Sequence, residues 1–290
     1  MDGMQRANCL LKHFIFNHLK GLPMKTIVNN LALAGAVALS LTSYQAMAQQ
    51  TTPATPVPVA AAPEPTPEHT LVPKVSVYSE YEYRGISQTA EKPALQFNLD
   101  YSHSSGFYLG TFVTNINWLK EAAKAGGFST GANIEWDIFG GYKFEVVKDV
   151  TVDVGYLRYE YPSSGAFNPS PNTDELYIGL TYGAFNTKYS QSVSNLFGFA
   201  NSKNSYFFEA NWAQEILPQL TANAQFARQS VKNNGDYSYN VFKLGATYDL
   251  GTGWAVGAYF KDTNAKQALY TVNGKDISNA RMVAFVSKAF

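Results

Sequence analysis

Apolar and polar residues alternate along much of the chain after residue 73. In residues 95–101, for example, Leu, Phe, Leu and Tyr occupy one set of alternate positions, and Gln, Asn and Asp occupy the other. A period of two predicts β-strands with one apolar and one polar face. The predicted strands are 75–84, 95–101, 107–115, 134–144, 150–156, 176–182, 185–192, 206–212, 220–227, 241–249, 254–261 and 281–290.

The connections between these strands alternate strictly in length. The short connections are 103–106, 146–149, 183–184, 216–219 and 250–253, and the long ones are 85–92, 118–130, 162–173, 193–203, 232–236 and 262–279. Transmembrane barrels have tight periplasmic turns at one end and longer outer loops at the other. A soluble β-sandwich, the competing interpretation, has no reason to sort its loops in this way. The pattern therefore predicts an all-β fold, a transmembrane antiparallel up-and-down β-barrel of about twelve strands.

Aromatic residues at the strand ends agree with a membrane barrel, because such residues settle at both membrane interfaces. The expected girdle beside the short turns is Tyr101, Phe107, Phe144, Tyr182, Trp212, Tyr248 and Trp254. The expected girdle toward the long loops is Tyr81, Tyr83, Trp136 and Phe260. Composition agrees too: only 15% of residues are charged, against roughly 25% in soluble domains. A net charge of zero argues against a nucleic-acid partner.

The N-terminal part predicts export across an inner membrane. Residues 24–48 combine Lys25, an apolar run and the small-residue motif Ala46-Met47-Ala48, the pattern of a secretory signal peptide. Residues 1–23 are then either a long leader or an upstream extension, with translation starting at Met24. Residues 49–72 are rich in Pro, Ala and Thr and predict an extended periplasmic spacer. Residues 73–290 are the predicted barrel, placed in the outer membrane of a Gram-negative bacterium.

Residues for catalysis or for metal binding are scarce. Cys9, the one cysteine, lies before the signal peptide, and His69 and His103 are the only histidines after it. We find no phosphate-binding glycine loop and no metal-ligand spacing, so the sequence predicts no cofactor, no metal site and no enzyme. The remaining enzymatic alternative is a barrel hydrolase that uses only carboxylates such as Glu80 and Glu82.

The polar faces of the strands are predicted to line the lumen. Their charged residues are Glu80, Glu82, Arg84, Asp100, Glu135, Asp137, Lys143, Asp153, Glu175, Lys188, Glu209, Lys243, Asp249 and Lys261. Barrels of eight strands are filled by side chains and those of sixteen or more leave a wide channel, so about twelve strands predict a narrow channel for small solutes or ions. The excess of carboxylates predicts a weak preference for cations. A structural or surface-binding barrel that does not conduct remains the alternative.

The segment 281–290 ends on Phe290, on the apolar face of the predicted last strand. This residue is interpreted as an assembly signal, with the barrel assembly machinery and outer-membrane lipids as the expected partners. Lys288 departs from the usual pattern, since an aromatic or apolar residue is common at that position, and is expected to extend toward the headgroups.

Several motifs resemble the TorF family, a group of candidate porins in proteobacteria. They are Y-R-G-I-S-Q-T (83–89), P-A-L-Q (93–96) and D-Y-S-H-S-S-G-F-Y-L-G-T (100–111), followed by E-W-D (135–137), G-G-Y (140–142), Y-E-Y-P (159–162) and the ending V-S-K-A-F (286–290). The resemblance spans nearly all of the chain after residue 73. It implies an outer-membrane β-barrel with a pore and no established substrate.

Overall fold

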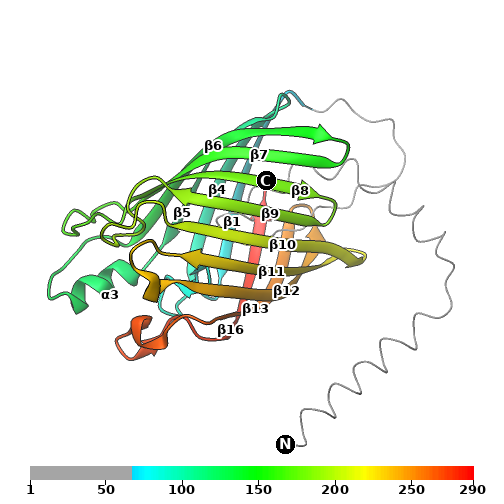
Figure 1. Cartoon of the computed structure of the whole chain (residues 1–290). Helices are drawn as coiled ribbons and strands as arrows, with labels where there is room; N and C mark the ends of the chain where they lie inside the picture. The colour runs from blue at the N-terminus through cyan, green and yellow to red at the C-terminus, as the bar shows by residue number, and fades with distance from the viewer. Residues whose placement is uncertain (1–66) are drawn as a thin grey trace, which may run out of the picture. The chain divides into compact units, whose positions relative to one another are not determined.

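Twelve strands close into one antiparallel barrel in the computed structural model, which describes residues 67–290 (Figure 1). Successive barrel strands are neighbours, and the first strand closes the barrel against the last. This arrangement confirms the predicted up-and-down barrel and all twelve predicted strands. The predicted upstream segment, the signal peptide and most of the predicted spacer lie outside the described residues.

The barrel strands are joined alternately by short turns and by long connections. Their bounds are β1 (His69–Tyr78), β4 (Ala94–His103), β5 (Phe107–Asn115), β6 (Ile134–Val147), β7 (Val150–Glu160), β8 (Thr173–Tyr182), β9 (Phe185–Ser192), β10 (Tyr206–Leu217), β11 (Leu220–Ser230), β12 (Tyr239–Gly251), β13 (Trp254–Thr263) and β16 (Arg281–Ala289). The short turns lie on the right of Figure 1, at what we call the short-turn end, and the long connections lie at the opposite, long-loop end.

The long connections hold the remaining elements. These are the hairpin of β2 (Glu82–Tyr83) and β3 (Ile86–Ser87), helix α3 (Trp118–Ala125), the 3₁₀ turns η2 (Gly235–Tyr237) and η3 (Gln267–Leu269), and the hairpin of β14 (Thr271–Val272) and β15 (Lys275–Asp276). Among residues 67–290, no helix has both the length and the apolar character needed to cross a membrane.

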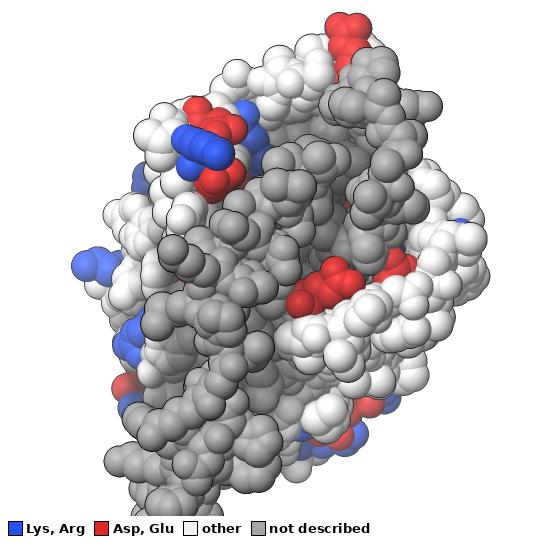
Figure 2. All heavy atoms as spheres, turned by 90° about the vertical axis from the view of Figure 1, so that its right-hand side faces the viewer, with Lys and Arg blue, Asp and Glu red and all other residues white. Residues whose placement is uncertain are grey.

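The outer surface of the barrel is apolar. Outward side chains such as those of Leu95, Leu176, Ile178, Leu244 and Met282 are 52–62% exposed, while the residues that alternate with them are mostly buried inside. A continuous apolar surface of this kind is unfavourable in water and is typical of a barrel surrounded by lipid. On the short-turn face, the visible side chains of described residues carry both signs of charge with uncharged surface between them (Figure 2).

Two of the short turns share one construction, which the sequence encodes locally. Glu145 accepts a hydrogen bond from the amide of Asp149 at 3.0 Å, and Glu215 accepts one from the amide of Gln219 at 2.9 Å. Asp149 and Gln219 have φ angles of 66° and 67°, and the strand register shifts just before each turn. In both turns the glutamate four residues before the positive-φ residue thus accepts from an amide in the irregular part of the ladder.

Inside the barrel, aromatic side chains lie over glycines. Phe139 lies over Gly110, Tyr108 over Gly141, Tyr177 over Gly155, Tyr259 over Gly245 and Phe285 over Gly257. In each pair an added Cβ on the glycine would come within 2.2–2.5 Å of the aromatic side chain. Rings from several strands, including Tyr78, Phe112 and Tyr159, form one cluster inside the barrel. Part of the interior is therefore a packed aromatic core.

The first strand begins earlier and ends earlier than the sequence pattern indicates. Its pairing with β4 starts at His69, whereas its pairing with β16 starts at Lys74. The carbonyl of Pro73 accepts a hydrogen bond from the amide of Phe290 at 3.0 Å. The N–H and the C=O of one strand residue point to the same neighbouring strand, which for Pro73 is β16. The N–H that proline lacks would therefore lie at the very end of the β16 ladder, where a proline is tolerated. Pro73 therefore lies within β1 rather than at its start.

The prediction that the first strand continues to Arg84 was wrong. The strand leaves the barrel wall after Tyr78, and all residues from Glu80 to Ser87 are buried, on both alternating faces. The chain turns into the lumen there, so Tyr81 and Tyr83 belong to the interior and not to the aromatic girdle. Trp136 and Phe260, the other residues of that predicted girdle, are exposed on the outside.

Candidate functional site

A short hairpin enters the barrel from the long-loop end. We call residues 79–93 the inward hairpin; it contains β2 and β3, joined by Arg84 and Gly85, both with positive φ. Glycine suits the second turn position, since a Cβ there would lie 2.5 Å from Thr263. The amide of Tyr81 donates to Thr89 at 3.0 Å, which closes the base of the inward hairpin.

Arg84, at the tip of the inward hairpin, reaches the far wall of the barrel. Its guanidinium lies 2.7 Å from the carboxylate of Glu175 on β8, and the two side chains are 5% and 1% exposed. It also donates to Gln229 on β11 at 3.0 Å and lies 4.4 Å from the ring centroid of Phe207 on β10. Burial opposes the charged guanidinium, but Glu175 outweighs it, so the pKa of Arg84 is raised well above its ordinary value. The tip is therefore fixed by a charged hydrogen bond.

Two lysines hold the inward hairpin from another side. Glu82 makes an ion pair with Lys243 of β12 at 2.6 Å and also accepts a hydrogen bond from the amide of Gly85. Lys261 of β13, which is fully buried, donates to the carbonyl of Gly85 at 2.9 Å. Each charged group of the turn thus has a partner of opposite charge or polarity on the barrel wall.

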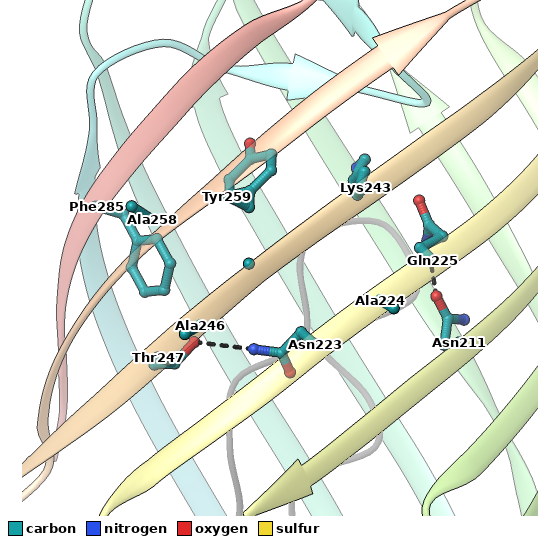
Figure 3. A pocket seen from close by; sticks show the side chains of 11 residues that line it. Asn211, Asn223, Ala224, Gln225, Lys243, Ala246, Thr247, Ala258, Tyr259 and Phe285 are labelled. Atoms are coloured by element: carbon teal, nitrogen blue, oxygen red, sulfur yellow. Dashed lines mark hydrogen bonds between the residues drawn. The ribbon is translucent and has the colours of Figure 1, made fainter. Parts of the chain in front are cut away.

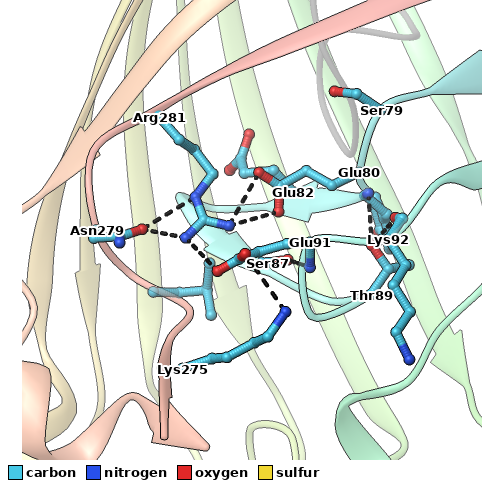
Figure 4. Close-up of polar contacts among 12 residues, drawn as sticks. Ser79, Glu80, Glu82, Ser87, Thr89, Glu91, Lys92, Lys275, Asn279 and Arg281 are labelled. Carbon is cyan, nitrogen blue, oxygen red and sulfur yellow. Dashed lines mark hydrogen bonds and ion pairs between the residues drawn. The ribbon is translucent and has the colours of Figure 1, made fainter.

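The base of the inward hairpin is bound to the last strand. Arg281 of β16 lies 3.3 Å from Glu80 and 3.0 Å from Glu91, and Lys275 lies 3.6 Å from Glu91 (Figure 4). Residues at the start and the end of the inward hairpin therefore share one arginine. This arrangement connects the inward hairpin to the long connection that precedes β16.

Tyrosines join the inward hairpin to β6 and β7. Tyr81 donates to one carboxylate oxygen of Glu135, and Tyr161 donates to the other at 2.8 Å. The hydroxyls of Tyr83 and Tyr159 form a further hydrogen bond. Burial raises the pKa of Tyr81 and Tyr83 well above the ordinary value, so both hydroxyls remain protonated. With Arg84 and the lysines, these bonds link the inward hairpin to strands from β6 round to β16.

Two pockets lie beside the inward hairpin or its partners on the barrel wall. The first, about 40 Å³, lies inside the barrel and is lined by polar groups that include Asn211, Asn223, Gln225 and Lys243 (Figure 3). The second, about 160 Å³, is lined by Arg84 and by aromatic residues of the long-loop end that include Trp118, Tyr161, Phe197 and Tyr239. The inward hairpin lines the second pocket with Tyr83, Arg84, Ile86 and Gln88, and it contacts Lys243 of the first pocket through Glu82.

The structure places all of the charged residues predicted for the lumen on the inner side of the barrel or on the inward hairpin. Glu80, Glu82, Arg84, Glu135, Asp137, Glu175 and Lys261 gather around the inward hairpin, and Asp100, Lys143, Asp153, Lys188, Glu209 and Asp249 lie buried or half-buried elsewhere on the inner face, with Lys243 contacting Glu82. Whether they line a conducting pore is a separate proposal.

Two basic residues of the interior, Lys74 and Arg281, were not among the residues predicted for the lumen. Lys74 is buried on the inner face of β1, and Arg281 contacts Glu80 inside the long-loop end. The alternation contained the signal, since Lys74 shares the parity of Ser76 and Tyr78, and Arg281 that of Val283. The predicted interior charges were nine carboxylates and five basic side chains. With Lys74 and Arg281 they become nine carboxylates and seven basic side chains.

Comparisons with known proteins found one matching family and several solved structures of low similarity to this chain. A family whose description is "Bacterial protein of unknown function (Gcw_chp)" matches residues 62–290. The KdgM porin structure is 8% identical over 76% of this chain and 98% of its own, with a TM-score of 0.47. Salmonella typhi OmpF in a complex with daunomycin is 8% identical over 77% of this chain and 97% of its own (TM-score 0.39), and Acinetobacter baumannii OccAB3 is 11% identical over 78% and 65% (TM-score 0.38). No curated protein matches the chain.

Proposed function

We propose that this chain, which belongs to the Gcw_chp family of bacterial proteins of unknown function, is an outer-membrane channel that the inward hairpin narrows. The observation that carries the proposal is a closed barrel, apolar outside and charged inside, crossed by an ion-paired hairpin. An outer apolar surface suits lipid, and inner charges suit an aqueous lumen. Small solutes or ions are the expected cargo, because the inward hairpin crosses the lumen to contact β6, β8, β11 and β12.

Polar atoms without protein partners support a lumen that contains water. Both carboxylate oxygens of Asp137 are buried and have no hydrogen-bond partner among the described residues, and the same holds for one oxygen each of Glu175, Glu209 and Gln225. A buried carboxylate without a partner is unfavourable by several kcal/mol or more, so such groups normally bind ordered water. Water beside these atoms, around the inward hairpin and along β10 and β11, would form the beginning of a conducting path.

The other sequence-based expectations stay proposals. Export by the predicted signal peptide, a long-loop end that faces the outside, and Phe290 as an assembly signal all fit an outer-membrane channel. The resemblance to the TorF family points to the same class of protein. A barrel that does not conduct is the main alternative, and the absence of enzymatic activity stays a prediction.

Charge selectivity tests the proposal and the role of the inward hairpin together. We expect wild-type protein in planar bilayers to conduct with a weak cation preference, weaker than the sequence-derived charges indicate, because Lys74 and Arg281 offset two carboxylates. The double substitution Glu80→Gln and Glu82→Gln removes two carboxylates, and it leaves Lys243 without its ionic partner and Arg281 paired with Glu91 alone. The reversal potential in a salt gradient should then shift toward anions, most strongly at low salt, since the Debye length is about 10 Å at 0.1 M.

The matched control is Glu160→Gln, which removes a carboxylate that pairs with Arg158 away from the lumen. This variant should keep the wild-type reversal potential. A wild-type protein that carries no current would favour the non-conducting barrel. An equal reversal potential for the double variant and wild type would show that Glu80 and Glu82 do not lie on the ion path.

A further inference from the structure

A pair of histidines lies at the short-turn end, away from the inward hairpin. His69 at the start of β1 and His103 at the end of β4 are direct partners in the antiparallel register. Their ring centroids are 5.0 Å apart. The carboxylate of Glu68 lies 3.4 Å from Nε2 of His103, and the possible ligand atoms of all three residues lie within 4.8 Å of one another.

Both rings form their side-chain hydrogen bonds through Nδ1, which makes Nε2 of each ring the candidate ligand atom. Nδ1 of His69 lies 2.8 Å from the hydroxyl of Tyr101, and Nδ1 of His103 lies 2.8 Å from Oγ of Ser105. A ring that donates from Nδ1 to an oxygen presents the lone pair of Nε2, which is how metal-binding histidines are usually oriented. In the structure the amide of Ser105 donates to Nδ1 of His103 at 3.1 Å. Metal binding through Nε2 places the proton on Nδ1, so this amide bond would be exchanged for the bond from Nδ1 to Oγ of Ser105.

We propose that Glu68, His69 and His103 bind a first-row transition-metal ion, with Zn²⁺ as the reference case. Two imidazoles and one carboxylate are a common zinc ligand set, which leaves a fourth position for water. Tetrahedral bonds of 2.0–2.2 Å separate neighbouring ligand atoms by about 3.3–3.5 Å, and Glu68 and His103 already meet that separation. The Glu68 side chain is 72% exposed, so it can move to bring its carboxylate into bonding distance of an ion held by the two histidines.

Binding would fasten the first residues of the barrel to its first short turn. The backbone already connects them, because the amide of Ser104 donates to the carbonyl of Glu68 at 2.9 Å. An ion shared by the two segments would hold the start of β1 against β4, beyond the region where β1 has β16 as a second partner. A ligand that binds only the folded barrel raises its stability.

Isothermal titration of the untagged full-length chain with Zn²⁺ tests the site. We expect one equivalent to bind, and His69→Ala or His103→Ala to lower the affinity at least tenfold. Zn²⁺ should also raise the thermal unfolding temperature of wild type but not of either variant. Cu²⁺ in place of Zn²⁺ should give an electron paramagnetic resonance spectrum with two coordinated nitrogens. Mg²⁺, which prefers oxygen ligands, should not compete.

The control is His13→Ala with His18→Ala, which removes the other two histidines of the chain and should leave binding unchanged. Before titration, gel electrophoresis checks that each variant is a folded barrel, which migrates more slowly after heating than before it. Equal affinity in wild type and in His69→Ala/His103→Ala would overturn the assignment, as would loss of binding in the control variant. Zn²⁺ binding to wild type without a rise in unfolding temperature would overturn the stabilising role.

Discussion

Arg84→Ala is expected to raise the single-channel conductance several-fold. The substitution removes the side chain that spans the lumen and leaves the carboxylate of Glu175 buried without its ionic partner. Removing one partner of a buried ion pair typically destabilises the folded structure by about 3–5 kcal/mol. The tip of the inward hairpin should therefore detach from β8 and β11, and the cross-section of the pore should grow. Recordings in planar bilayers measure the change directly.

Arg158→Ala is the control for this experiment. Arg158 also pairs with two carboxylates, Glu160 and Asp174, but its side chain is 37% exposed. Its loss should leave the conductance at the wild-type value. If Arg84→Ala forms a heat-modifiable barrel and conducts no more than Arg158→Ala, the inward hairpin is not the constriction.

Gly155→Ala is expected to destabilise the barrel far more than substitution of a glycine with open space around it. A Cβ at Gly155 would lie 2.4 Å from the ring of Tyr177 and 2.7 Å from the carbonyl of Gly140. The carbonyl belongs to the neighbouring strand and cannot rotate away, so β6 and β7 would have to separate. Overpacking of this kind costs about 1–3 kcal/mol. The difference in unfolding free energy between the variant and wild type is measured in lipid vesicles, by urea unfolding monitored through tryptophan fluorescence.

Gly165→Ala provides the comparison, because nothing lies within 4 Å of a Cβ at that position in a long connection. Its unfolding midpoint should equal that of wild type. Equal midpoints for Gly155→Ala and Gly165→Ala would mean that the aromatic rings inside the barrel do not depend on the glycines beneath them.

The sequence predicted the barrel wall well because each strand carries its own signal. Lipid on one side and polar groups on the other impose a period of two, which is legible within each segment such as 95–101. Turn positions are also local, as the glutamates before Asp149 and Gln219 show. Parity likewise placed Glu135 and Lys188 on the inner side of the wall.

The inward hairpin escaped prediction because its local pattern equals that of a strand. Residues 80–84 alternate acidic or basic residues with tyrosine, and the alternation cannot distinguish a lipid-facing tyrosine from one enclosed by protein. Tyr81 and Tyr83 are buried where they form hydrogen bonds with Glu135 and Tyr159, which belong to strands distant in the sequence. Only the closed barrel brings these groups together.

The histidine pair was missed for a related reason. His69 and His103 are 34 residues apart, so no short metal-binding motif joins them, and His69 fell within the predicted spacer. The register of β1 against β4 makes them neighbours. Strand pairing, and not sequence spacing, therefore determines the proposed ligand set.

The central claim is that current flows through the barrel lumen past the inward hairpin. Asn223 lies on the inner face of β11 and lines the first pocket, of about 40 Å³, inside the barrel, and Phe226 points outward from the same strand. With Cys9 replaced by alanine, Asn223→Cys and Phe226→Cys each provide one thiol for a water-soluble methanethiosulfonate reagent during a planar-bilayer recording. The account predicts a stepwise fall in single-channel current after modification of Asn223→Cys and no change for Phe226→Cys. No current from either protein, or a current from Asn223→Cys that persists unchanged after its thiol has been modified, would contradict it.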